Sequence, residues 1–87
     1  MNAIQTVRSK DKYDYSSNPK TVTTILVNGV KVVELKPIKK AVKEGYDSRV
    51  RFTVNNHRNE LGLKYWFSGA RSIKQVIEYL EEQLKSI

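Results

Sequence analysis

The sequence predicts a small α+β domain, in which a four-stranded antiparallel sheet made of two β-hairpins packs on a C-terminal helix. Asn28-Gly29 joins two apolar strand-like runs, side-chain character alternates with period two over residues 49–67, and apolar residues recur at helical spacing near the end. With 87 residues, the chain has room for one hydrophobic core. We therefore assign residues 21–87 to a single domain, preceded by a flexible N-terminal arm over residues 1–20.

The N-terminal arm is predicted from its polar composition. Residues 9–20 form a polar tract that ends in Ser16, Ser17, Asn18 and Pro19, which are residues typical of turns and loops. A solvated arm is the default for such a terminus. The alternative is a short edge strand over Ala3–Arg8, carried by the apolar residues Ile4 and Val7.

The first hairpin is predicted over Thr21–Val27 and Val30–Lys36, because Asn28-Gly29 tolerates the two positive φ values of a type I′ turn. A two-residue loop would place Ile25 opposite Val32 and make both faces of the hairpin apolar near the turn. Two arrangements can bury these residues. Either a β-bulge resets the register, or one face packs on the helices and the other on a second copy of the chain, as a homodimer.

A short helix is predicted between the hairpins, over residues 37–45. Pro37 suits its first position and Gly45 suits the left-handed residue that ends it. Its lysines Lys39, Lys40 and Lys43 lie away from the apolar side. Such a lysine cluster binds phosphates in some proteins and is merely solvated in others.

The second hairpin is predicted over residues 49–55 and 61–67. One face takes Val50, Phe52, Val54, Leu61, Leu63, Tyr65 and Phe67, and the other takes Arg49, Arg51, Thr53, Asn55, Gly62, Lys64 and Trp66. The second face therefore combines basic side chains with the only tryptophan of the chain. The connecting loop carries Asn, His and Arg58, which are suited to contacts with base edges or phosphates, although asparagine also occurs in turns for backbone reasons alone.

The last element is a helix that begins after Ser72. Ser72 and Gln75 form a capping box. The residues on one stripe of this helix are Ile73, Val76, Ile77, Leu80, Leu84 and Ile87. That stripe is predicted to pack on the sheet and to leave the opposite sheet face as the site.

The charge of the chain points to a polyanionic partner. Its net charge is +7, and all but two of its 16 Lys and Arg residues precede the last helix. We therefore expect nucleic-acid binding, with single strands favoured because bases stack on an exposed tryptophan, and duplex binding by a two-stranded ribbon in the major groove as the alternative. The predicted nucleic-acid-binding residues are Arg49, Arg51, Lys64 and Trp66, with Lys39, Lys40, Lys43, Arg58 and Arg71 as further phosphate contacts.

The same surface is compatible with two alternative roles. In the first, it is an ordinary outer sheet face, with Trp66 covered by the N-terminal arm or a second copy. In the second, the protein is a small inhibitor or adaptor, of the kind that phages and mobile elements encode, which docks on an acidic host protein. A chain without cysteine, with one histidine and no glycine-rich phosphate loop, predicts no enzyme, no metal and no cofactor. No apolar run approaches the ~20 residues of a membrane span, so we expect a soluble cytoplasmic protein.

Overall fold

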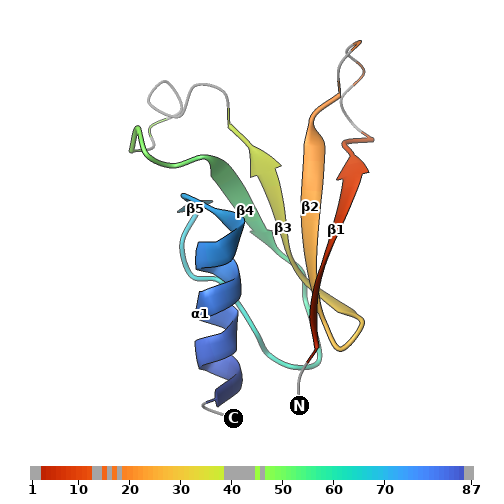
Figure 1. Ribbon diagram of the computed structural model, residues 1–87, viewed down its shortest axis with the longest axis vertical. Helices are drawn as coiled ribbons and strands as arrows, with labels where there is room; N and C mark the ends of the chain where they lie inside the picture. The colour runs from red at the N-terminus through yellow and green to blue at the C-terminus, as the bar shows by residue number, and fades with distance from the viewer. Residues whose placement is uncertain are drawn as a thin grey trace.

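The computed structural model describes residues 3–12, 15, 17, 19–38, 45 and 47–85, and within them it has an antiparallel sheet and one helix (Figure 1). The elements are β1 (Ile4–Lys10), β2 (Thr21–Val27), β3 (Val30–Pro37), β4 (Phe52–Asn56), β5 (Gly69–Ala70) and α1 (Ile73–Lys85). The α+β class is confirmed. The predicted number of four strands is wrong, because the sheet has five.

The strands follow one another across the sheet in chain order, from β1 at one edge to β5 at the other. All four neighbouring pairs are antiparallel. In Figure 1, α1 lies beside β5 and β4, while β1 forms the far edge of the sheet. The two edges are therefore separate surfaces, and only one of them adjoins the helix.

Strand β1 occupies part of the predicted N-terminal arm. It pairs with β2 without interruption, from Ile4 opposite Val27 to Lys10 opposite Thr21. The edge-strand alternative is thus confirmed, and residues 4–10 belong to the sheet. Every residue of β1 after Ile4 is exposed. A strand shows alternating apolar and polar residues when one of its faces packs on a core. Residues 5–10 are exposed on both faces, so they lack this alternation and their sequence resembles that of a solvated arm.

The β2–β3 hairpin turns at Asn28 and Gly29, as predicted, with φ values of 53° and 81°. Its register shifts between Ile25 and Leu26, so that Ile25 faces Val33 and the intervening Val32 is the extra residue of a β-bulge. The pairing of Ile25 with Val32 is therefore wrong, and the β-bulge is confirmed.

The bulge gathers the apolar residues of the hairpin into one core. Ile25, Val32 and Val33 are all fully buried. The register on which a second apolar face depended does not form, so this hairpin gives no reason for a homodimer, which stays a prediction.

Strand β3 extends to Pro37, which pairs with Phe52. Pro37 therefore ends a strand and does not begin a helix. Residues 39–44, with Lys39, Lys40 and Lys43, lie outside the described residues, so the rest of the predicted helix is untested. Gly45 has a φ of 84°, in the left-handed region that was expected at this position.

The predicted second hairpin is only partly present. Its first strand is β4, but residues 61–67 are not a strand, and β4 pairs with the two-residue β5 instead. The predicted alternation is kept at Leu63 and Tyr65, which are buried, and at Lys64 and Trp66, which are exposed. Phe67 departs from it, since its side chain is 58% exposed.

The core lies between the sheet and α1. Its buried members are Ile25, Val27, Val32, Val33, Leu35, Leu63, Tyr65, Ala70, Val76 and Leu80. The helix begins at the predicted capping box, in which the Gln75 amide donates to Ser72 Oγ at 3.1 Å. The Gln75 side chain in turn accepts a hydrogen bond from the Arg71 amide at 2.9 Å. This cap fixes Arg71 at the junction between β5 and α1.

Candidate nucleic-acid interface

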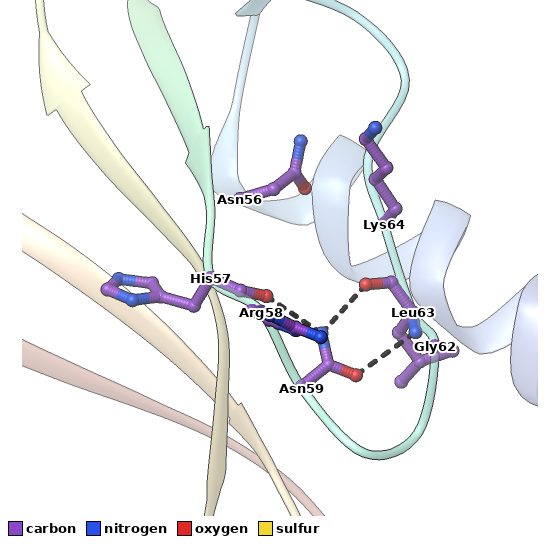
Figure 2. A pocket seen from close by; sticks show the side chains of 7 residues that line it. All are labelled: Asn56, His57, Arg58, Asn59, Gly62, Leu63 and Lys64. Atoms are coloured by element: carbon purple, nitrogen blue, oxygen red, sulfur yellow. Dashed lines mark hydrogen bonds between the residues drawn. The ribbon is translucent and has the colours of Figure 1, made fainter.

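Three side-chain carboxamides hold residues 63–65 in place. Each of them forms what we call a carboxamide clamp, in which one amide group accepts from the N–H and donates to the C=O of a single residue. Asn59 clamps Leu63 at 3.1 and 2.8 Å, Gln83 of α1 clamps Lys64 at 3.2 and 2.6 Å, and Asn56 of β4 clamps Tyr65 at 2.8 and 2.9 Å. Figure 2 shows the Asn59 clamp closing the loop after β4.

The clamps explain why residues 61–67 alternate like a strand without forming one. A ladder would satisfy the backbone groups of Leu63, Lys64 and Tyr65 with those of a neighbouring strand. Here the partners come from a loop, a helix and the end of β4. Asn56 and Asn59 therefore act on the backbone, which was one of the two roles expected for the asparagines of this loop.

Trp66 follows the clamped residues directly. Its side chain is 66% exposed, although it is one of the largest apolar groups of the chain. Lys64 Nζ lies 4.8 Å from the centroid of the Trp66 ring, which is a cation–π contact. The structure thus brings together two of the predicted binding residues, an aromatic and a cation, on a segment with a fixed backbone.

Three other aromatic rings anchor the opposite side of this segment. Tyr65 meets Phe67 at 5.4 Å and Tyr79 of α1 at 5.2 Å between ring centroids, and Phe67 meets Tyr79 at 5.9 Å. All three contacts are edge-to-face, which is a favourable arrangement for aromatic rings. Burial, and to a lesser degree the charge of Tyr79, raises the pKa of Tyr65. These rings fasten residues 65–67 to the helix.

A second group of predicted residues lies at the start of β4. Arg49 donates through Nε and a terminal nitrogen to the two carboxylate oxygens of Asp47, each at 3.2 Å, and its amide donates to the same carboxylate at 2.8 Å. These hydrogen bonds lower the pKa of Asp47 to about 2, and the charge of Arg71 contributes slightly. Asp47 therefore already occupies the guanidinium of Arg49.

Arg51 connects this group to β5. Its amide donates to the carbonyl of Ala70 at 2.9 Å, and its guanidinium donates to the carbonyl of Ser48 at 3.1 Å. Arg71 follows Ala70 in the chain and is exposed. Arg49, Arg51 and Arg71 thus lie at one end of the edge that β5 forms.

Arg58 lies at the other end, beside a shallow pocket of about 350 Å³. The residues that line the pocket are Asn56, His57, Arg58, Asn59, Gly62, Leu63 and Lys64 (Figure 2). None of them is acidic. The His57 ring points away from Lys64 in Figure 2, and its Nε2 lies 3.0 Å from a carboxylate oxygen of Glu34 on β3.

The predicted patch of Arg49, Arg51, Lys64 and Trp66 is therefore divided into two groups. Lys64 and Trp66 touch each other, whereas Arg49 and Arg51 lie near Arg71. No hydrogen bond, ion pair or ring contact between described residues joins the groups, and the chain from Lys64 to Arg71 spans at most ~25 Å. We call the surface along residues 63–71, with Arg51 and Arg58 at its ends, the Trp66 edge.

Two features of this surface are absent from the sequence-based prediction, and only the first is out of reach of sequence reasoning. The clamp by Gln83 joins residues that are far apart in the chain, and no local pattern reveals it. The pairing of Asp47 with Arg49 was visible, because an aspartate two residues before a cation in a turn can bind both its amide and its side chain.

Comparisons with known proteins found no matching family model, curated protein or solved structure. Within the described part of the chain, no group of three or more His, Cys, Asp or Glu residues could hold a metal ion. Among the same residues, no helix is long and apolar enough to cross a membrane.

Proposed function

We propose that this protein binds single-stranded nucleic acid along the Trp66 edge, with a base stacked on Trp66. The observation that carries the proposal is the exposure of Trp66 beside Lys64, on a segment whose backbone is held by side-chain clamps. An exposed aromatic ring beside basic side chains is the arrangement on which single-stranded nucleic acids stack their bases.

The energetics of stacking support this use of Trp66. A base stacked on an aromatic side chain contributes ~1–3 kcal/mol and is accepted with little sequence preference. The clamps at Lys64 and Tyr65 order the backbone before the ligand arrives, so binding does not have to order it. Lys64 Nζ lies over one face of the Trp66 ring, so a base that stacks on this face displaces the ammonium, which can then contact the phosphate of the stacked nucleotide.

In this proposal, basic residues at both ends of the edge follow the nucleic-acid backbone. Arg58 and Lys64 lie before Trp66, and Arg51 and Arg71 lie beyond it; all four side chains belong to exposed residues. The chain from Lys64 to Arg71 spans at most ~25 Å, which fits a short single strand, because the single-stranded site of one OB-fold domain covers ~4–16 nucleotides.

The fold supports single strands over duplexes. Reading a major groove with a β-ribbon requires two paired strands that project from the protein. The ribbon expected over residues 49–67 is not formed, since β4 lies between β3 and β5 within the sheet. Residues 61–67, which were expected to form the second strand of that ribbon, are not a strand and instead carry Trp66.

A set of matched variants tests the proposal by fluorescence anisotropy of a labelled single-stranded oligonucleotide of about 12 nucleotides. Trp66→Ala is expected to weaken binding by about 5- to 150-fold, and Trp66→Phe is expected to retain most of the affinity. Tyr15→Ala is the control, because Tyr15 is an aromatic residue that is 92% exposed but lies outside the edge. Unchanged binding by a folded Trp66→Ala variant would contradict the proposal.

A further inference from the structure

Strand β1 is an edge of the sheet, and no other described strand pairs with its outer row of backbone groups. The Asn28 amide donates to the Ala3 carbonyl at 2.8 Å, and the Asp11 amide donates to the Lys20 carbonyl at 2.8 Å. Since the register between these points is unbroken, the odd-numbered residues of β1 direct their backbone groups to β2. The even-numbered residues, Ile4 to Lys10, direct theirs away from the sheet.

This edge has the properties of a strand that accepts another. Its outward residues are Ile4, Thr6, Arg8 and Lys10, and among the described residues no hydrogen bond engages their outward amides or carbonyls. The strand contains neither a proline nor a bulge, both of which commonly protect sheet edges. A partner in extended conformation can therefore continue the ladder along the full length of β1.

The charge beside β1 is positive. Arg8 and Lys10 are exposed and have no acidic partner among the described residues. A pocket of about 310 Å³ adjoins the strand, and it is lined by Ser9, Lys10, Asp11, Lys12, Val22, Thr24, Lys31 and Glu34.

One acid of that pocket is paired with a lysine, since an Asp11 carboxylate oxygen lies 2.7 Å from Lys36 Nζ. The other, Glu34, places a carboxylate oxygen 3.0 Å from His57 Nε2. Lys10 and Lys31 are both exposed and outnumber Glu34, so the pocket keeps an excess of positive charge for a ligand. The surface next to β1 is complementary to carboxylates.

We propose that the β1 edge binds an acidic segment of a partner protein, which adds to the sheet as a further strand. Backbone hydrogen bonds to the even-numbered residues of β1 supply affinity for any extended segment. Carboxylates of the partner that lie near Arg8, Lys10 and Lys31 make an acidic segment bind better than a neutral one. A second copy of the chain fits less well, because pairing β1 with itself would line one seam with Arg8 and Lys10 from both copies, and each copy carries a net charge of +7. Nucleic acid lacks the alternating amide donors and acceptors that this edge matches.

The site is independent of the proposed function, because β1 and β5 are opposite edges of the sheet. The test uses the full chain and a fluorescein-labelled peptide of about eight residues that alternates Glu with Val, a length that matches a typical strand. Two further peptides are methylated on alternate backbone nitrogens, in one or the other phase. All three have the same charge and side chains, so nonspecific attraction affects them equally.

The parent peptide is expected to bind, with an affinity that falls as salt rises, and one methylated phase is expected to bind at least about tenfold more weakly than the other. Thr6→Pro removes an outward amide at an edge position that tolerates proline, and it should cause a similar loss, whereas Thr6→Val should not. Equal binding of the two methylated peptides, no binding at low salt, or self-association of the chain through β1 would overturn the inference.

Discussion

The clamp between Asn56 and Tyr65 provides the sharpest prediction for stability. Asn56→Ala removes the two hydrogen bonds, at 2.8 and 2.9 Å, that satisfy the Tyr65 N–H and C=O. Tyr65 is only 2% exposed, so its backbone groups gain little from water when the amide is lost. An unsatisfied buried group costs ~1–3 kcal/mol. Two such groups would cost ~2–6 kcal/mol if water stayed excluded, but Asn56 is itself exposed and its removal admits some water, so we expect the free energy of unfolding to fall by about 2–3 kcal/mol.

The assay is urea unfolding followed by far-ultraviolet circular dichroism, supported by thermal unfolding. For a domain of this size, a loss of about 2–3 kcal/mol lowers Tm by roughly 10–20 °C. The matched control is Asn55→Ala, because Asn55 is exposed, lies next to Asn56 in β4 and makes no side-chain hydrogen bond among the described residues. That control should stay within about 0.5 kcal/mol of the parent. If Asn55→Ala lowers the free energy of unfolding as much as Asn56→Ala does, the side-chain amide of Asn56 does not hold Tyr65 in place.

Two further predictions concern Asp47. Asp47→Asn should release the Arg49 guanidinium and raise the affinity for single-stranded nucleic acid by about two- to fivefold, whereas Glu81→Gln, an equal charge change on exposed α1, should have a smaller effect. An effect of Glu81→Gln as large as that of Asp47→Asn would show that net charge alone is responsible. The hydrogen bonds from Arg49 lower the pKa of Asp47 to about 2, so its contribution to stability is complete above about pH 5 and is lost as the pH falls through 2. Carboxyl NMR shifts should give a midpoint near 2 for Asp47 and a higher midpoint in Arg49→Gln, still below the ordinary value of about 3.9 because the amide of residue 49 continues to donate to the carboxylate; an unchanged midpoint in the variant would refute the assignment to the Arg49 side chain.

Much of the fold follows from local sequence signals. Asn28-Gly29 predicts the turn of the first hairpin because few other residue pairs adopt its two positive φ values. The capping box at Ser72 and Gln75 marks the start of α1, because the Ser72 hydroxyl accepts a hydrogen bond from the Gln75 amide at the first turn of the helix. In each case the determinant lies within a few residues of the feature, so the sequence alone is sufficient.

Features that depend on distant partners are less visible. The period-two pattern over residues 61–67 reports which side chains are covered, and this holds at Leu63 and Tyr65. The pattern does not report which groups form hydrogen bonds with the backbone. Here side-chain amides form the hydrogen bonds that a neighbouring strand would otherwise form. Strand β1 shows the reverse case, in which a strand forms without an alternating pattern, because an edge strand that is exposed on both faces carries none.

The candidate site was predicted in part. Exposure of Lys64 and Trp66 follows from their phase relative to the buried Tyr65. The division between these two residues and the arginines near β5 depends on where β4 begins and on the partners of Arg49 and Arg51, which are tertiary properties.

The most direct test of nucleic-acid binding is a titration that follows the fluorescence of Trp66, the only tryptophan, during addition of single-stranded or duplex oligonucleotides at two salt concentrations. We expect single strands to quench the emission, with an affinity whose logarithm falls by about 3 per tenfold increase in salt if Arg51, Arg58, Lys64 and Arg71 each contact a phosphate. Duplexes should bind more weakly. Emission that single strands leave unchanged at low salt would contradict the assignment of the Trp66 edge as the binding surface.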